Sequence, residues 1–298
     1  MLLGSFNRTV SGIKVLLFVV VWMLSSMTGA TEILQTKEKD SSVVDSSYPV
    51  PVGERLTYAI EWDPPWWFFL LPTMHAADAE LQLTGNAEFK GRKAYRIEFN
   101  AQSSGILAKL SGMTIDDEFL FLSVPDTLCT LSVSKKIREG KRKRQINVEY
   151  LPETGQLHIR ELDESVAPPK IEKDTLKENI PVCVQDPLSA LYFLRRTPLR
   201  KGLIHTSIIG HDDVVKEVQS KVEKLEDVKT SDGKIPAWKI DTVALMGGLF
   251  KKGGQFKIWL SADERQIPLQ FEVKVYIGRV FGKLTTISEE STTRQPGL

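Results

Sequence analysis

Short segments in which apolar and polar residues alternate with a period of two recur through the chain. They are clearest at Leu56–Trp62, Tyr95–Ala101, Phe256–Leu260 and Leu269–Ile277. Successive residues of a strand point to opposite faces, so each segment presents one apolar face and one mainly polar face. The pattern predicts an all-β protein, mainly antiparallel, in which roughly a dozen strands form a barrel- or roll-like sheet with one short helix.

The helix is predicted at Asp186–Arg196, where the alternation stops. Asp186 is a favourable N-cap, Pro187 suits the first helical position because its missing N–H costs nothing there, and Pro198 closes the segment. Arg195 is unusual on an apolar face, and either pairs with a buried carboxylate or packs its stem while its charge stays in water. The residues predicted to share the sheet-covering face are Leu188, Leu191, Tyr192 and Arg195.

Two other stretches carry weaker patterns. Val215, Val218, Val222 and Leu225 have the spacing of an amphipathic helix, but three are β-branched and the run ends at an Asp-Gly turn, which favours a strand. Residues 161–181 are rich in Pro, Lys, Asp and Glu, and are predicted to form a long loop.

The first 30 residues have the composition of a secretory signal peptide. Arg8 and Lys14 form a positive region before an apolar run from Val15 to Leu24, and Thr28–Ala30 offers small residues for cleavage. The run is shorter than the roughly 20 apolar residues that span a bilayer, which favours a cleaved signal over a retained anchor. Residues 31–49 are predicted to be a flexible leader, residues 50–287 a single β-rich domain, and residues 288–298 a flexible tail.

Charge and cysteine content narrow the class of protein. The formal net charge of +1 becomes −1 without Arg8 and Lys14, so the charge balance gives no indication of nucleic-acid binding. The two cysteines, Cys129 and Cys183, either form a disulfide or remain separate buried thiols. The absence of a C-x-x-C motif argues against a redox enzyme and a structural zinc site, and no cofactor or metal is expected.

Four segments share short motifs with one family of proteins. The predicted helix, with Gly202 after it, is similar to the element D-x-L-S-A-L-Y-x-L-R, and Gly53–Tyr58 to an opening strand G-E-x-L-x-Y. Lys257–Ser261 and Arg265–Pro268 are similar to a closing hairpin, I-W-L-S followed by a charged turn and I-P. The chain therefore resembles the exported bacterial family called domain of unknown function 3108. Over residues 50–287, the resemblance implies an exported, β-rich envelope protein and no assigned catalytic residues.

The connection from Asp63 to His75 stands where that family usually has a short glycine-containing turn. Its prolines oppose continuous sheet pairing, so the loop either plugs one end of the barrel, contacts a membrane or lipid, or binds a protein partner. Tryptophan suits a membrane interface because its ring is apolar while its N–H stays hydrated. The loop contains six consecutive large apolar residues: Trp66, Trp67, Phe68, Phe69, Leu70 and Leu71.

The densest basic cluster is centred on Glu139-Gly140. On a hairpin, its residues would project to both faces, and would either attract anionic lipid headgroups and other envelope polymers or form a solvated tip that discourages edge aggregation. The solvated tip is the favoured interpretation, and nucleic acid is not an expected partner because no RNA- or DNA-binding motif accompanies the cluster. Its members are Lys135, Lys136, Arg138, Lys141, Arg142, Lys143 and Arg144.

Candidate catalytic groups are few. The histidines lack the spacing of a metal site, and His211–Asp213 is more typical of a turn with solvated carboxylates. Asp116 and Glu118 would share one strand face, yet neighbours on one strand cannot flank a glycosidic bond from opposite sides. Ser103–Gly105 lacks a recognisable activating partner.

These patterns favour a non-enzymatic protein of the bacterial periplasm or envelope that binds an apolar or amphipathic, lipid-like ligand. We expect the ligand between the sheet and the helix, with the aromatic loop near the mouth, and a peripheral membrane contact is compatible with this. The alternative is a structural or assembly factor of the envelope. A hydrolase of envelope polymers is third, and would require convergent carboxylates from Asp116, Glu118 and Asp212.

Overall fold

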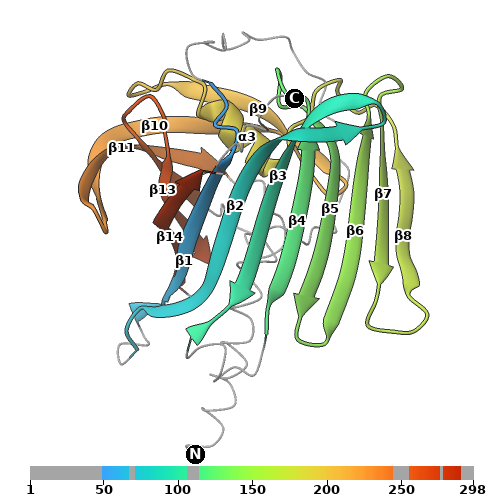
Figure 1. Ribbon diagram of the computed structural model, residues 1–298, viewed down its shortest axis with the longest axis horizontal. Helices are drawn as coiled ribbons and strands as arrows, with labels where there is room; N and C mark the ends of the chain where they lie inside the picture. Colours follow the sequence, from blue (N-terminus) through green and yellow to red (C-terminus); the bar gives the residue numbers. More distant parts are fainter. Residues whose placement is uncertain (1–48, 67–70, 106–113, 244–254, 276–277, 290–298) are drawn as a thin grey trace, which may run out of the picture.

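Among the residues that the computed structural model of the protein describes, fourteen antiparallel strands form one continuous, strongly curved sheet (Figure 1). The structure describes residues 49–66, 71–105, 114–243, 255–275 and 278–289. The predicted signal peptide, nearly all of the predicted leader and most of the predicted tail lie outside these residues. The mainly antiparallel, roll-like fold expected from the alternation is confirmed.

The sheet consists of two meanders. The first contains β1 (Glu54–Asp63), β2 (Met74–Phe89), β3 (Arg92–Ser103), β4 (Asp116–Ser123), β5 (Thr130–Glu139), β6 (Arg142–Leu151), β7 (Gln156–Asp163) and β8 (Lys170–Lys177). The second contains β9 (Ile204–His211), β10 (Val214–Thr230), β11 (Gly233–Val243), β12 (Gln255–Ser261), β13 (Pro268–Val275) and β14 (Gly278–Glu289). Because β1 pairs with β14, the first and last strands join the two meanders, and β8 and β9 are left at the sheet edges.

Burial explains both the correct and the incorrect strand predictions. Strand β1 alternates strictly between buried and half-buried residues, which is the pattern that made it recognisable. The segment from Val215 to Leu225 is part of β10, as the valines indicated. The predicted loop at residues 161–181 is wrong in part, because it contains β8. This edge strand is mostly exposed and charged, so its sequence lacks the apolar face that marks a strand.

The helix α3 (Pro187–Leu194) follows a segment that brings the two meanders together. Thr130 at the start of β5 donates its N–H to Val184 at 2.7 Å, while Gly210 in β9 donates to Gln185 at 2.8 Å. Gly210 permits this close approach, because a Cβ at that position would lie 2.1 Å from the hydroxyl oxygen of Tyr150. A short irregular segment, instead of a direct β8–β9 ladder, thus bridges the edges of the roll.

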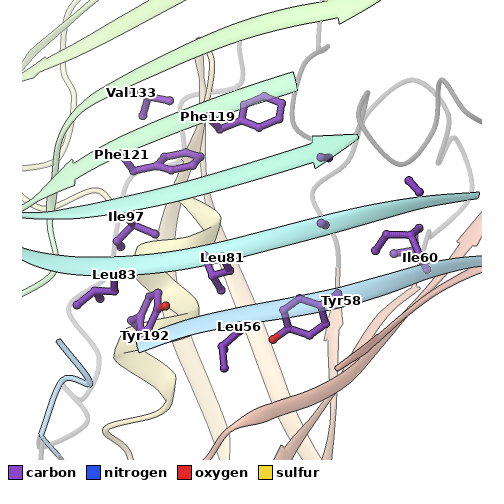
Figure 2. Packing of buried hydrophobic residues seen from close by; sticks show 14 of the residues in the cluster. Leu56, Tyr58, Ile60, Leu81, Leu83, Ile97, Phe119, Phe121, Val133 and Tyr192 are labelled. Atoms are coloured by element: carbon purple, nitrogen blue, oxygen red, sulfur yellow. The ribbon is translucent and has the colours of Figure 1, made fainter. Parts of the chain in front are cut away.

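The core lies between the concave face of the sheet and α3. Figure 2 shows Tyr192 of the helix among apolar side chains from five strands. These side chains are fully or almost fully buried, and they include Leu56, Tyr58, Ile60, Leu81, Leu83, Ile97, Phe119, Phe121 and Val133. The single apolar face predicted for the strands is therefore the face that the helix covers.

The antiparallel pairing gives the roll two ends. At the helix end, β1 begins at Glu54, β4 ends at Ser123 and β5 begins at Thr130, all in contact with residues of α3 or its caps. At the opposite end, which we call the Trp66 end, β1 connects to β2, β3 connects to β4, and β5 connects to β6 at Glu139–Arg142. Figure 1 shows α3 in the upper part of the molecule and the β5–β6 hairpin at the bottom.

Candidate functional site

The start of α3 is fixed by a buried hydrogen-bond network around Asp186. Oδ1 of Asp186 accepts from the backbone N–H groups of Leu188 at 2.8 Å and Ser189 at 2.9 Å, which confirms its predicted N-cap role. Oδ2 accepts from the hydroxyl of Thr130 at 2.8 Å, and that hydroxyl accepts from the Asp186 N–H at 2.7 Å. Burial raises the pKa of the Asp186 carboxyl, while these hydrogen bonds act in the opposite direction.

The end of α3 is joined to β1 by a buried ion pair. The guanidinium of Arg195 donates to both carboxylate oxygens of Glu54, at 2.6 and 2.8 Å. Gln266 donates to the carbonyl oxygen of Arg195 at 3.0 Å, and the Arg195 guanidinium lies 5.1 Å from the centre of the Tyr192 ring. Of the two outcomes considered for Arg195, pairing with a buried carboxylate is therefore the correct one.

The segments that carry the family-like motifs meet at this buried cluster. Glu54 and Tyr58 belong to the opening strand, Arg195 to the helix, and Gln266 and Pro268 to the closing hairpin. The hydroxyl of Tyr58 donates to the carbonyl oxygen of Pro268 at 2.8 Å. Because these groups are buried and bonded to one another, they stabilise the helix end and do not form an accessible site.

The helix covers the sheet with a face that differs slightly from the predicted one. Ser189, Tyr192 and Leu194 are buried, whereas Leu188 and Leu191 are only half-buried. Core side chains pack beneath Tyr192 on the concave face of the sheet (Figure 2). These contacts give no support to the predicted ligand position between sheet and helix, which stays a prediction.

Three further contacts join the first meander to the segments that follow it. Cys129 and Cys183 form a disulfide with their Cα atoms 5.1 Å apart, which links the β4–β5 connection to the segment before α3. The ammonium group of Lys135 lies 2.6 Å from Oδ1 of Asp212, and both side chains are buried. Asp213 pairs with two lysines of β8. The prediction that the carboxylates of His211–Asp213 are solvated is wrong for Asp212, because the turn is inserted against β5 and β8.

Most of the predicted basic cluster is neutralised by neighbouring carboxylates. Lys135 points into the interior, so it is not available to an anionic surface and its prediction as a surface contact is wrong. Lys141 and Lys143 are exposed at the β5–β6 hairpin, at the Trp66 end. The remaining four residues form ion pairs: Lys136 with Glu118, Arg138 with Glu164, Arg142 with Glu139, and Arg144 with Glu161.

The aromatic loop begins with an exposed side chain. Trp66, just after the end of β1, is 85% exposed, so it does not plug the roll. Leu71 is half-buried and packs against the core, whereas Trp67, Phe68, Phe69 and Leu70 lie outside the described residues. Four positions before Trp66, the side chain of Trp62 is buried in the core. The two tryptophans therefore have opposite environments.

The carboxylates considered for hydrolysis do not converge. Asp116 and Glu118 share the exposed face of β4, as predicted, while Asp212 is buried on the inner side and paired with Lys135. Asp117, between them in sequence, points inward and is buried. This separation removes the geometry that glycoside hydrolysis by those three groups would require.

A histidine and a serine are brought together at the Trp66 end, which the sequence did not reveal because 29 residues separate them. Nε2 of His75 lies 2.7 Å from the hydroxyl of Ser104 and 3.2 Å from Oδ1 of Asp78. A Ser-His-Asp relay requires the serine and the carboxylate to contact different ring nitrogens. Both partners here approach the same nitrogen, so this arrangement does not activate Ser104 through Asp78.

Two further properties concern the part of the chain that the structure describes. No group of three or more His, Cys, Asp or Glu side chains there has an arrangement that could hold a metal ion. None of its helices combines the length and the apolar character needed to cross a bilayer.

Similarity to solved structures agrees with this architecture. A β-barrel-like protein of domain of unknown function 1849 from Brucella abortus has a TM-score of 0.52 and 12% identity, with 80% of this chain and 98% of that chain covered. A protein with a YmcC-like fold from Bacteroides fragilis has a TM-score of 0.33 and 9% identity, covering 81% and 98%. A hypothetical protein from Chlamydia trachomatis has a TM-score of 0.30 and 11% identity, covering 82% and 91%. The first of these similarities supports the barrel-like fold alone.

Sequence comparison identifies the family. No curated protein matches the chain. The profile of a family described as protein of unknown function, DUF3108, matches residues 57–285, which span β1 to β14 and include α3. The four motif segments noted in the sequence lie within this range or directly before it. The chain therefore belongs to the DUF3108 family.

Proposed function

We propose that this protein is a non-enzymatic, exported component of the bacterial envelope that binds amphipathic, lipid-like molecules at its Trp66 end. The observation that carries the proposal is that Trp66, just after the end of β1, is 85% exposed, whereas Trp62 within β1 is buried. A large aromatic side chain left in water at a loop is a common feature of membrane and lipid contacts.

Charge at the same end supports a lipid with an anionic headgroup. Lys141 and Lys143 are exposed on the β5–β6 hairpin, and four to five strand spacings, about 20 Å, separate this hairpin from the end of β1. An apolar anchor and exposed ammonium groups at that separation can contact one lipid surface together. The Cys129–Cys183 disulfide supports an oxidising compartment, such as the periplasm.

The expected strength is that of a reversible contact. Burying one tryptophan side chain contributes about 2 kcal/mol, and each lysine near an anionic surface about 1 kcal/mol. The described residues therefore supply about 4 kcal/mol, equivalent to roughly a thousandfold enrichment at the surface. This magnitude fits transient engagement of a membrane or a lipid and is too small for permanent anchoring.

Co-sedimentation of the mature protein with vesicles tests the proposal. Vesicles of phosphatidylglycerol and phosphatidylethanolamine should bind the wild type, and Trp66→Ala should weaken binding roughly thirtyfold. The matched control is Val182→Ala, which removes an apolar side chain that is 78% exposed near the disulfide, away from the Trp66 end. Equal binding by wild type and Trp66→Ala would contradict the proposal.

Lipid extraction and mass spectrometry of protein purified from its native envelope provide the second test. Enrichment of a lipid in the wild type, and its loss from Trp66→Ala, is the expected result. A different result is that Trp66→Ala no longer associates with the envelope, while purified wild type neither binds vesicles nor carries a lipid. That result would mean that Trp66 binds a protein. The function would then be that of an assembly factor, and lipid binding would be rejected.

A further inference from the structure

The pairing between β4 and β5 is interrupted near the Trp66 end by a side-chain carboxyl group. The regular ladder stops at Lys136 of β5, and pairing resumes at an isolated bridge between Ile115 and Glu139. Within the gap, the backbone N–H of Arg138 donates to Oδ1 of Asp117 at 2.6 Å. The Asp117 carboxyl therefore takes the place of a backbone acceptor between the two strands.

A second carboxyl group lies on the same inner face. Asp117 is 1% exposed and Glu139 is 2% exposed. Oε2 of Glu139 accepts from Arg142 at 3.1 Å, but Oε1 of Glu139 and Oδ2 of Asp117 have no hydrogen-bond partner within the described part of the chain. Buried carboxylate oxygens without partners are costly when charged, because they have lost water and gained no donor.

The charges around the pair leave one negative charge in excess. On β4, Asp116 is exposed and adds a further, more distant negative charge. On β5 and β6, the guanidinium groups of Arg138 and Arg144 already pair with Glu164 and with Glu161 of β7. Arg142 is the guanidinium that pairs with Glu139. Two carboxylates and one guanidinium would carry a net charge of −1, which a bound proton removes.

The expected protonation of Asp117 agrees with this arrangement. Burial is the main cause that raises the pKa of Asp117 to about 7, and the charge of Glu139 raises it further, while the Arg138 N–H and Arg142 lower it. Burial also raises the pKa of Glu139, against the influence of Arg142 and Arg144. With a pKa of about 7, Asp117 is expected to gain or lose its proton near neutral pH.

We propose that Asp117 and Glu139 form a proton-binding site that controls how firmly β4 and β5 close at the Trp66 end. With one proton bound, the pair and Arg142 are neutral together and the strands remain joined. When the proton leaves, the second buried negative charge favours local opening, which hydrates both carboxylates. Because Lys141 and Lys143 lie on the adjoining hairpin, opening changes their presentation to an anionic surface; this last step rests on the proposed function.

Hydrogen exchange of the mature protein, corrected for the intrinsic pH dependence of exchange, tests the closure. Peptides that contain Asp117 or Glu139 should lose protection as the pH rises from 5 to 8, by roughly tenfold per unit below the titration midpoint. Asp117→Asn should stay protected throughout, because its side chain carries no charge. Asp116→Asn, one residue away on the exposed face, should behave as wild type.

A direct titration keeps the proposal testable if Asp117→Asn fails to fold. The side-chain carboxyl carbon of Asp117, followed by NMR in the wild type, should titrate near pH 7 and shift downward in Glu139→Gln. A midpoint near 4, or identical exchange of wild type and Asp117→Asn across the pH range, would overturn the proposal.

Vesicle binding separates this proposal from the proposed function. If both hold, binding should differ between pH 5 and pH 8 for the wild type and remain constant for Asp117→Asn. Absence of binding at every pH, together with pH-dependent exchange, would reject the lipid function and retain the proton site. Binding that depends on Trp66 but is identical at both pH values would reject only the regulatory step.

Discussion

The two ends of the roll differ in how their polar groups are satisfied. At the helix end, Asp186 accepts four hydrogen bonds within 3 Å and Arg195 binds both oxygens of Glu54. The carboxylate oxygens there are thus all bonded, although Oη of Tyr192, Nε of Arg195 and Oε1 of Gln266 have no hydrogen-bond partner among the described residues. At the Trp66 end, Asp117 and Glu139 each keep one carboxylate oxygen without a partner in the part of the chain that the structure describes, and Trp66 is 85% exposed. Buried carboxylates whose two oxygens are both bonded stabilise a fold, while unbonded carboxylate oxygens and exposed aromatic residues are more typical of functional surfaces.

The helix end contains the segments that identify the family, whereas the Trp66 end contains the residues that we expect to bind a ligand. The family-like motifs at Gly53–Tyr58, Asp186–Arg196 and Arg265–Pro268 converge on the helix end and close the roll. Function is therefore better sought where the chain departs from them. The Asp63–His75 connection, which contains none of these motifs, places Trp66 at the opposite end.

The largest expected effect is the loss of the ion pair at the helix end. Arg195→Met should leave the Glu54 carboxylate buried without a partner and lower the free energy of unfolding by about 3–5 kcal/mol. Urea denaturation of the mature protein measures this. The matched control is Arg55→Met, one residue from Glu54, because Arg55 pairs with Glu80 where the side chains are 42% and 33% exposed.

The control should cost less than about 1 kcal/mol, since exposed ion pairs contribute little. A double variant, Glu54→Leu with Arg195→Met, should recover much of the lost stability because no charge remains buried. Equal effects of Arg195→Met and Arg55→Met would show that the helix end does not depend on its buried pair.

The disulfide should have the next largest effect. Cys129 and Cys183 are separated by 54 residues, and closing a loop of that length stabilises by about 4 kcal/mol in the chain-entropy model, with measured values often smaller. Replacing both with serine should lower the free energy of unfolding by about 3 kcal/mol. Wild type under reducing conditions should match the double variant; a difference between them would mean that the serines themselves disturb the helix end.

The sequence predicted the fold where the determinants are local. Strict alternation marked β1, and Asp186 with Pro187 marked the start of α3, because period and capping depend on neighbouring residues. Strand β8 was missed because an exposed, charged edge has no apolar face to reveal it. The presence of a short helix and an antiparallel roll was therefore predictable, but the edge of the sheet was not.

The candidate sites depended on contacts between distant segments. Arg195 and Glu54 are 141 residues apart, and Lys135 and Asp212 are 77 apart, so the partner of each charge follows from strand order and not from spacing. Alternation correctly placed Asp116 and Glu118 on one face and Asp117 on the other. It could not show that Asp117 interrupts a ladder beside Glu139, because that requires the register of β4 against β5.

The free energy of unfolding should depend on pH in opposite directions through two buried carboxyl groups, those of Asp212 and Asp117, because the pKa of the first is lowered and that of the second is raised. Burial is the largest influence on the pKa of Asp212 and acts to raise it, but the charges of Lys135, His211 and Lys173 and the hydrogen bond from Lys135 together outweigh burial and lower the pKa. The stabilisation from Asp212 is therefore present above pH 4 and is lost on acidification below that. The pKa of Asp117 is raised to about 7, so its contribution is present below pH 4 and is lost as the pH rises to 7.

Thermal unfolding between pH 3 and 8 measures both contributions. Asp117→Asn should flatten the decrease between pH 4 and 7, on the order of 2 kcal/mol, and leave the acid side unchanged. Lys135→Met should reduce the stabilisation that wild type gains above pH 4, whereas Lys136→Met, its exposed neighbour, should not. If Asp117→Asn and wild type show the same pH dependence of thermal stability, the inferred electrostatic difference between Asp117 and the Lys135–Asp212 pair is wrong.

The smallest expected effect on stability is the one that carries most information about function. Trp66→Ala should change the free energy of unfolding by less than about 0.5 kcal/mol, because its side chain is already in water. Trp62→Ala, four residues earlier, should cost about 3–5 kcal/mol because it leaves a cavity in the core. If Trp66→Ala instead destabilises as strongly as Trp62→Ala, the exposed tryptophan is part of the core and its proposed role at a lipid surface fails. A neutral effect on stability combined with weaker vesicle binding would assign the residue to function alone.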